Sequence, residues 1–213
     1  MPRSAGDRIG PYEIIELLGA GGCGEVYKAR RDGGDVFALK VLTSTSPTTV
    51  AHFERELEAT PDHPHIRKVH RYGTADDGTR WLEMDYLAGD SLRDRMNRRR
   101  LTWAEVVALA TQTCAALEAA HERGVIHRDL KPENVFVGPD PGLDVRVVDF
   151  SIALLQDAER LTRTGMILGT FQYMSPEQVR GDKALDARSD LWSLGAILYE
   201  CAAGRCPFQS PTL

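Results

Sequence analysis

The chain has few cysteines and no metal-finger pattern. No two of them have the C-x-x-C spacing of zinc sites; they are Cys23, Cys114, Cys201 and Cys206. The six histidines include no Cys/His set at finger spacing either. We therefore expect reduced thiols, with neither a disulfide framework nor a structural zinc site.

Long hydrophobic runs are also missing. No stretch approaches the roughly 18 apolar residues that a membrane-spanning helix needs. The N-terminus lacks the basic stretch and apolar core of a signal peptide. We therefore expect a cytoplasmic protein with no membrane segment in this chain. At 213 residues and 42% hydrophobic composition, it can bury one large or two smaller cores.

Charge of one sign is not in large excess. The net charge of −5 gives no general attraction to nucleic acid, so we expect no nucleic-acid partner. Five arginines form a local exception, namely Arg93, Arg95, Arg98, Arg99 and Arg100. We interpret this arginine cluster as a solvated helix end and turn. Docking of nucleic acid or a membrane surface is the alternative.

One short segment carries most of the chemistry. Residues 127–134 read His-Arg-Asp-Leu-Lys-Pro-Glu-Asn, which combines a proton acceptor, cations and a carboxamide metal ligand. In protein kinases such a loop places an Asp at the substrate hydroxyl and an Asn on magnesium. The segment matches that pattern letter for letter, so the chain resembles a Ser/Thr protein kinase.

Three further motifs occur in the order that the family requires. Residues 18–26 read Leu-Gly-Ala-Gly-Gly-Cys-Gly-Glu-Val, a glycine-rich loop, and Val-Phe-Ala-Leu-Lys follows at 36–40. Asp-Phe-Ser at 149–151 and Ser-Pro-Glu at 175–177 resemble the metal-binding and activation-segment motifs. A glycine loop alone is weak evidence, but the conjunction identifies the chain as a member of the eukaryotic-like (bacterial-type) Ser/Thr protein kinase family.

The resemblance implies a two-lobed α+β fold. We expect an N-terminal tail at 1–10, a small antiparallel ATP-binding β lobe at 11–87 and a helical catalytic lobe at 88–213. Strand patterns in the small lobe lie at 12–18, 24–30, 36–42, 66–73 and 80–86, with a short helix at 49–59.

The second lobe should contain two long helices. A Thr-x-x-Glu capping box at 102–105 opens the first, and the second is predicted as a buried helix from Asp190 to Ala202. The apolar positions of the first helix recur at helical spacing and are predicted to form a core column; they are Val106, Val107, Leu109, Ala110, Cys114, Leu117 and Ala120.

The resemblance also implies roles at the reacting centre. Asp129 would accept or orient the substrate hydroxyl proton, and Lys131 would steady the γ-phosphate. Asn134 and Asp149 would hold Mg²⁺ (or Mn²⁺). Lys40 would reach the α- and β-phosphates of ATP. His127 is expected to be structural, packed beneath the aromatic ring of the Asp-Phe-Ser motif.

ATP is expected to lie between the glycine loop and a hinge at 83–87, with Met84 as gatekeeper. Glycines let backbone amides approach phosphates where a Cβ would block them. Backbone groups of Asp85 and Leu87 would bind adenine. The full nucleotide set is Leu18, Gly19, Ala20, Gly21, Gly22, Cys23, Gly24, Val26, Ala38, Lys40, Asp85, Leu87 and Phe136.

Lys40 needs an acidic partner from the predicted helix at 49–59. Glu56 is our choice, and we include it among the catalytic residues. The interval from Glu56 to the His-Pro at 63–64 is about two residues shorter than the family pattern, which leaves Glu54 as the alternative.

Two threonines resemble the autophosphorylation sites of bacterial kinases. We expect phosphate on Thr162 and Thr164, stabilised by Arg128 through charge-assisted hydrogen bonds. The alternative is that both are ordinary loop hydroxyls. Thr170 is expected to contact Asp129 and Lys131.

The chain departs from the family pattern in two places. Ser151 stands where the family has Gly. The match runs to Phe208 and the chain stops at Leu213, so we expect a catalytic domain truncated at its C-terminal end. Glu177 would then lack its arginine partner, a costly state for a buried carboxylate, and apolar helix faces would be exposed.

The resemblance thus implies a kinase that transfers the ATP γ-phosphoryl to protein Ser/Thr hydroxyls and phosphorylates its own activation loop, with a homodimer possible. One alternative is an inactive truncated fragment that acts as a nucleotide-binding or scaffold protein. A kinase-like small-molecule phosphotransferase is disfavoured by Lys131 and by the Ser-Pro-Glu motif.

Overall fold

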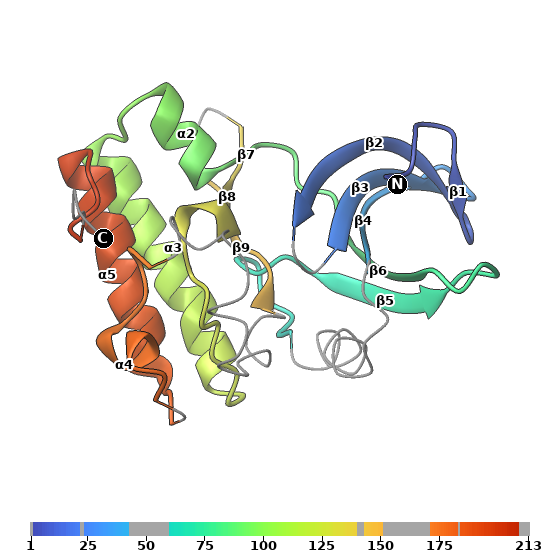
Figure 1. Cartoon of the computed structure of the whole chain (residues 1–213). Coiled ribbons are helices and arrows are strands. Elements are labelled where there is room, and N and C mark those ends of the chain that lie inside the picture. Colours follow the sequence, from blue (N-terminus) through green and yellow to red (C-terminus); the bar gives the residue numbers. More distant parts are fainter. Residues whose placement is uncertain are drawn as a thin grey trace. The chain divides into compact units, whose positions relative to one another are not determined.

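The computed structural model describes residues 2–21, 24–42, 60–139, 143–150, 171–182 and 184–208. The chain divides into two compact units, Met1–Thr60 with Arg67–Leu87, and Pro61–Ile66 with Ala88–Leu213 (Figure 1). Several predictions concern residues outside the described ones: the short helix at 49–59 and the roles of Gly22, Cys23, Glu54, Glu56, Ser151, Thr162, Thr164 and Thr170.

The first unit is built on one antiparallel sheet, as predicted. Its six strands lie in the order β1-β2-β3-β4-β6-β5, and every neighbouring pair is antiparallel. The strands are β1 (Arg8–Ile9), β2 (Tyr12–Gly21), β3 (Gly24–Arg31), β4 (Val36–Val41), β5 (Val69–Thr74) and β6 (Arg80–Asp85).

The two faces of this sheet bury different clusters, because successive strand side chains point to opposite faces. On β4, Leu39 joins a cluster that contains Tyr12 and Trp81. Its neighbour Ala38 packs instead with Met84 of β6. The same alternation sends Lys40 to the face of Ala38, and Lys40 is only 7% exposed.

The glycine-rich segment joins β2 to β3. Register shifts after Ile14 and after Leu17 interrupt the pairing of the two strands, and such bulges bend a strand. Gly24 has φ 150°, and a Cβ there would lie 2.1 Å from the carbonyl oxygen of Val41. Only glycine fits this close approach of β3 to the end of β4.

The second unit is mainly helical. It contains α2 (Leu92–Arg98), α3 (Trp103–His121), the 3₁₀ turn η1 (Pro132–Asn134), α4 (Pro176–Val179) and α5 (Ala187–Ala203). A small sheet joins β7 (Asp90–Ser91), β8 (Val135–Val137) and β9 (Val145–Val147). Helices α3 and α5 pack together around one core, to which Leu109 and Ile197 contribute (Figure 1).

The predicted start of α3 is confirmed, but the predicted set of core residues in this helix is partly wrong. Thr102 and Glu105 form the capping box. However, Val107 is 63% exposed and Cys114 is also exposed. These two residues are seven apart and share one face of the helix, which points to solvent. Thr113 and other small residues face the core in their place.

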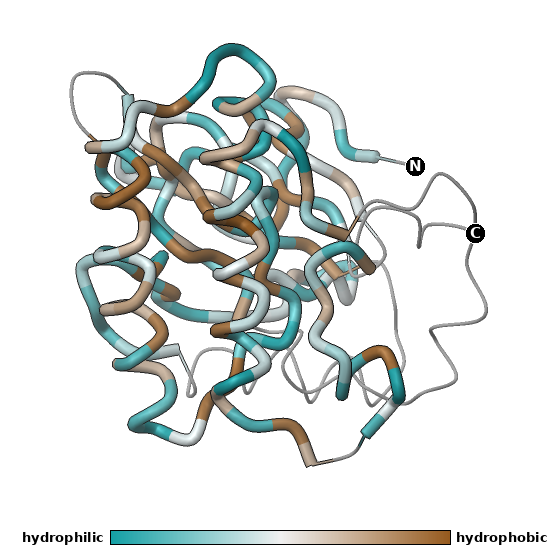
Figure 2. The backbone as a smooth tube through the Cα atoms, turned by 90° about the vertical axis from the view of Figure 1, so that its left-hand side faces the viewer, coloured by the Kyte–Doolittle hydropathy of each residue, from teal (hydrophilic) through white to brown (hydrophobic). Residues whose placement is uncertain are grey.

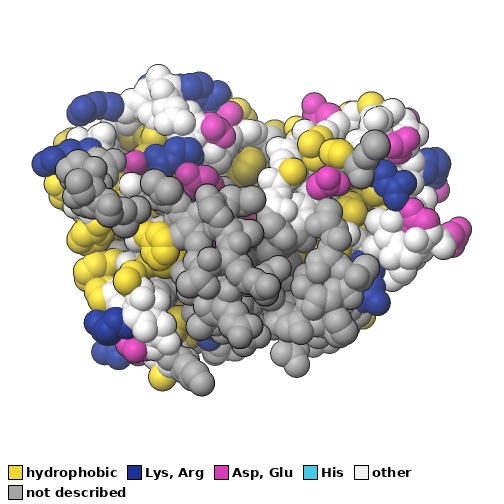
Figure 3. All heavy atoms as spheres, viewed as in Figure 1, with side chains coloured by type: hydrophobic (Ala, Val, Ile, Leu, Met, Phe, Trp, Pro, Cys, Tyr) yellow, Lys and Arg dark blue, Asp and Glu magenta, His cyan; other side chains and the backbone are white. Residues whose placement is uncertain are grey.

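Helix α5 is buried on one side only, although we predicted a buried helix. Leu191, Trp192 and Tyr199 are 50%, 39% and 43% exposed, and the Trp192 ring stacks on that of Phe208 at 5.3 Å. We call these four residues the α5 apolar patch. Figure 2 views the molecule from the α5 side and shows hydrophobic and hydrophilic positions alternating there. Figure 3 shows apolar side chains over the same region.

No helix in the described ranges is both long and apolar enough to cross a membrane.

Candidate active site

The segment at 127–134 is anchored by a buried carboxylate on α5. Asp190 Oδ2 accepts the backbone N–H of His127 at 2.8 Å, and its Oδ1 accepts that of Arg128 at 2.8 Å. The Nε2 of His121, at the end of α3, lies 2.7 Å from Oδ2. Sequence reasoning gave Asp190 no role. The available signal was an Asp in the first turn of a helix predicted to be buried, because a fully buried carboxylate needs partners.

Three predicted catalytic residues meet within this segment. Lys131 Nζ donates to Asp129 Oδ2 at 2.7 Å. Asn134 Nδ2 donates to the same oxygen at 3.1 Å and to the Asp129 carbonyl at 2.8 Å. The turn η1 brings Asn134 back over Asp129. The result is a carboxylate whose direction is fixed by two neighbours.

Asp149 comes shortly after β9, and the residue before it is hydrogen-bonded to this cluster through the backbone. Val148 N–H donates to the Asn134 carbonyl at 3.0 Å. Asp149 has φ 60°, a left-handed conformation that is uncommon away from glycine. Phe150 is 5% exposed and contacts His127, so the histidine has the structural packing that we expected.

The residues present suit a hard divalent cation. Mg²⁺ takes oxygen ligands and keeps several waters, so one or two protein oxygens suffice. Asn134 uses its Nδ2 on Asp129, which leaves its Oδ1 as an acceptor. Asp149 supplies a carboxylate. The described residues contain no group of three or more His, Cys, Asp or Glu that would form a metal site made only of protein ligands.

The first unit carries the predicted nucleotide residues on one sheet face. Ala38 pairs with Met84, and Lys40 pairs with Val26. The Asp85 N–H donates to the carbonyl of Lys68 at 3.0 Å.

The other predicted nucleotide residues are distributed over both units. Gly19 and Gly21 have open space where a Cβ would lie. Leu18 is 45% exposed. Ala20 is exposed and Leu87 half-buried. Phe136 belongs to β8 of the second unit and is half-buried.

Sequence reasoning placed Glu83 in the hinge but missed its burial and its hydrogen-bond partners. Glu83 is 1% exposed and accepts hydrogen bonds from Tyr12 at 2.7 Å and from Arg71 at 3.0 and 3.1 Å. Burial raises its pKa, but these donors outweigh that effect and hold the pKa below the ordinary value. The alternation of apolar and polar residues along β6 does not indicate that Glu83 has hydrogen-bond partners.

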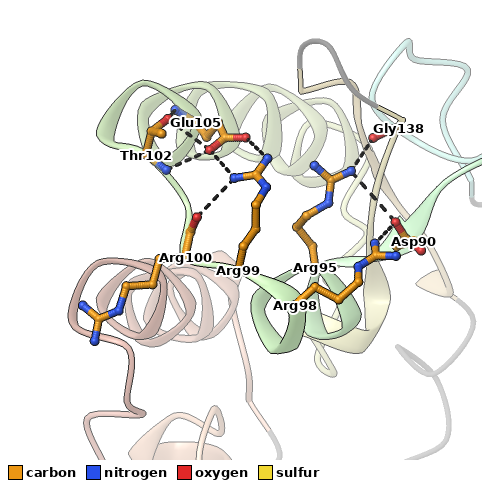
Figure 4. A network of polar contacts seen from close by, with 8 residues as sticks. All are labelled: Asp90, Arg95, Arg98, Arg99, Arg100, Thr102, Glu105 and Gly138. Carbon is orange, nitrogen blue, oxygen red and sulfur yellow. Dashed lines mark hydrogen bonds and ion pairs between the residues drawn. The ribbon is translucent and has the colours of Figure 1, made fainter.

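The arginine cluster begins with pairs around β7. Arg95 donates to the Gly138 carbonyl at 2.9 Å and lies 3.9 Å from Asp90. Arg98 pairs with the same carboxylate. Figure 4 shows Arg95 and Arg98 of α2 converging on Asp90. These contacts fix α2 against the small sheet.

The remaining arginines of the cluster also contact helix ends or neighbouring helices. Arg99 donates to both carboxylate oxygens of Glu105 at 2.6 and 3.0 Å, closing the start of α3 (Figure 4). Arg93 donates to Glu200 of α5 at 2.8 Å. Four of the five arginines thus have carboxylate partners, and the guanidinium of Arg100 lies against Gly204. The cluster joins helix ends, as we interpreted it, but it is not simply solvated, because Arg95 is only 4% exposed.

Glu177 differs from our expectation of a buried, unpaired carboxylate. It is half-buried, and its Oε1 accepts the Ser189 hydroxyl at 2.7 Å. That hydrogen bond lowers the pKa of Glu177. A hydroxyl donor is available because Ser189 lies in the first turn of α5. Sequence spacing does not show this contact between Ser189 and Glu177.

Comparison with known proteins gives one consistent answer. Residues 12–212 match the family described as protein kinase domain. The chain is 44% identical over 213 residues to the serine/threonine-protein kinase pkn3 of Myxococcus xanthus, covering 93% of this chain and 39% of that protein. It is 38% identical over 215 residues to PknD of Mycobacterium tuberculosis, covering 98% and 32%.

A third relative is PknH of Mycobacterium bovis, 37% identical over 212 residues, with 96% of this chain and 35% of the relative covered. The chain therefore spans about a third of the length of these curated relatives. The catalytic-loop geometry, the antiparallel sheet with its helical partner unit, and a family match over nearly all residues agree. The chain belongs to the protein kinase family, as a Ser/Thr protein kinase domain homologous to bacterial Pkn kinases.

Proposed function

We propose that this chain transfers the γ-phosphoryl group of ATP to Ser or Thr hydroxyls of proteins. The observation that carries the proposal is the orientation of Asp129. Lys131 and Asn134 both donate to its Oδ2. Among the described residues none donates to Oδ1, which is left to accept the hydroxyl proton of a substrate.

Transfer is mainly a matter of positioning and charge neutralisation. The substrate oxygen forms a bond to the γ-phosphorus while the bond from that phosphorus to the bridging oxygen breaks, and ADP leaves. The hydroxyl proton passes to Asp129. Lys131, beside Asp129, offsets the negative charge of the transferred group. When bound, Mg²⁺ (or Mn²⁺) would be held by Asn134 and Asp149 and would neutralise phosphate charge.

Nucleotide binding is assigned to the Lys40 face of the first unit. The ammonium group of Lys40 pairs with the α- and β-phosphates, and the glycine-rich residues 19–24 cover them. Val26, Ala38 and Met84 give this face its apolar surface, which supports adenine binding there. Glu56 holds Lys40, with Glu54 as the alternative. In this proposal residues 11–87 act as the ATP-binding lobe and 88–213 as the catalytic lobe.

We also propose autophosphorylation of Thr162 and Thr164. Arg128 supports this, because its Nε is buried and has no hydrogen-bond partner among the described residues. A buried unpaired guanidinium nitrogen favours an anionic partner. Phosphopeptide mapping after incubation with ATP should find phosphate on these threonines, and phosphate found only elsewhere would disprove it.

The experiment for the main proposal is transfer of radiolabelled phosphate from ATP, with magnesium, to a generic basic protein. Asp129→Asn should lower the rate by about 10²–10⁴-fold, the usual contribution of a positioned acid or base. Asp77→Asn is the matched control, because Asp77 is 49% exposed and pairs with Arg3 in the first unit. It should keep the wild-type rate.

Two outcomes would overturn the proposal. A folded, ATP-binding wild-type chain that transfers no label would be a nucleotide-binding or scaffold protein. Label transferred to an aminoglycoside or choline, but not to protein, would assign a small-molecule phosphotransferase.

A further inference from the structure

The residue before Asp129 has a strained backbone. Arg128 has φ 64°, a region that non-glycine residues occupy only when surrounding contacts hold them there. Its N–H is held by Asp190 Oδ1 at 2.8 Å. Its carbonyl accepts Gln178 Nε2 at 2.6 Å. The peptide groups on both sides of Arg128 are therefore fixed, one by α5 and the other by α4.

The orientation of the Gln178 amide is determined by its two partners. Its Oε1 accepts the Ser175 N–H at 3.0 Å, and its Nε2 donates to the Arg128 carbonyl. The reverse orientation would place two donors together and two acceptors together. The side chain is 3% exposed, so water does not substitute for these partners.

We propose that Gln178 is a positioning residue for phosphoryl transfer. By fixing the Arg128 carbonyl, it sets the direction in which the side chain of the next residue, Asp129, points from the backbone. It also joins the helix of the Ser-Pro-Glu motif to the catalytic loop. Because an effect on turnover presupposes the phosphotransfer proposed above, this role of Gln178 rests on that function.

Gln178 also serves in the capping box of α4, and the two roles can be separated. The cap uses the side-chain oxygen, as the Ser175 N–H donates to it. A glutamate performs that part equally well. Only the amide nitrogen can donate to the Arg128 carbonyl. Gln178→Glu therefore keeps the cap and removes the positioning contact, and Gln178→Met removes both.

The test compares both variants with wild type in steady-state kinetics at pH 8. We expect kcat to fall about 10–100-fold in each, as slight misplacement of a reacting group does. The KM for ATP should stay within about 2-fold, because a contact that acts only on positioning leaves ground-state binding unchanged.

Gln112→Glu is the matched control. Gln112 makes the same pair of contacts elsewhere, donating to the Leu143 carbonyl at 2.7 Å and accepting the Val145 N–H at 2.9 Å. Loss of the hydrogen bond that Gln112 donates should lower stability and leave kcat unchanged.

Backbone hydrogen exchange gives a second readout that needs no activity. The amides at 127–134 should exchange about 10-fold faster in both Gln178 variants and not in Gln112→Glu, since one net hydrogen bond is lost. If wild type is active and both variants keep kcat and protection, the role of Gln178 is wrong while the kinase function stands. If wild type is inactive, unchanged exchange would refute the contact by itself.

Discussion

The ring of Phe150 lies edge to face against the ring of His127, with centroids 4.7 Å apart and planes at 62°. His127 is fully buried, and its Nε2 lies 2.9 Å from the Val148 carbonyl. One side chain of the catalytic loop thus contacts the residues on either side of Asp149. This pair of contacts holds the chain on either side of the proposed metal-binding residue.

Removing the Phe150 ring should therefore affect stability and turnover together. For Phe150→Ala we expect a loss of about 3–5 kcal/mol in the free energy of unfolding, the usual cost of deleting a buried aromatic ring. Urea denaturation measures the first effect and phosphate transfer the second. Phe208→Ala is the control, because Phe208 is 51% exposed and its loss should cost far less. Equal costs for the two variants would contradict this account.

Asp190→Asn should weaken the anchor of the catalytic loop. One carboxylate oxygen becomes an NH₂ group that faces a backbone donor, so we expect a loss of about 1–3 kcal/mol from an unmade buried hydrogen bond. Asp186→Asn is the matched control. Asp186 caps α5 through the Arg188 N–H, and asparagine caps equally well. Unchanged denaturation midpoints for both variants would refute the anchoring role.

Stability should fall in acid partly through Glu105. The hydrogen bonds from Arg99 and from the Thr102 backbone lower its pKa to about 2. A carboxylate whose pKa is depressed on folding stabilises the protein above its unfolded pKa, near 4.3. That contribution disappears as the pH falls from there to about 2.

Glu105→Gln should retain the cap on Thr102 and lose the ion pair with Arg99. We expect the wild type to lose more stability than this variant between pH 5 and pH 3, in the window where Glu105 titrates. Thermal unfolding across that pH range tests it. Parallel curves for the two proteins would assign the acid sensitivity to other groups.

Two glycines should respond in opposite ways to alanine. At Gly73 of β5, a Cβ would lie 2.4 Å from the Trp81 ring, and Trp81 belongs to the sheet core. Gly73→Ala should cost about 1–3 kcal/mol by overpacking. At Gly195, within α5, no neighbouring atom outside the helix backbone lies within 4 Å. Gly195→Ala should stabilise by about 0.5–1 kcal/mol, the difference in helix propensity. Differential scanning calorimetry separates the two.

The sequence predicts the parts of the fold that depend on neighbouring residues. The catalytic loop, the α3 capping box and the strands of the first sheet depend on local order and periodicity, which the sequence displays directly. The exposed face of α3 is harder to predict from the sequence, because Val107 and Cys114 are apolar residues that lie on the solvent face. Side-chain hydrophobicity alone does not show which of two adjacent faces of a helix is buried.

Contacts between distant segments were not predictable. Asp190, Gln178 and Glu83 act through partners 50 or more residues away in the chain. No pattern in a single sequence pairs such positions. The residues with a direct chemical role could be proposed from motifs, whereas the residues that orient them could not.

The dependence of the catalytic loop on Asp190 bears on how the domain matures during synthesis. Arg128 and its acceptor are separated by 62 positions in the chain. A ribosome making about 5–20 residues per second therefore finishes the loop several seconds before the carboxylate that holds it exists. During that interval the His-Arg-Asp segment has been translated but lacks its anchor. The loop arrangement on which the proposed phosphoryl transfer depends is thus complete only when α5 has emerged from the exit tunnel and docked.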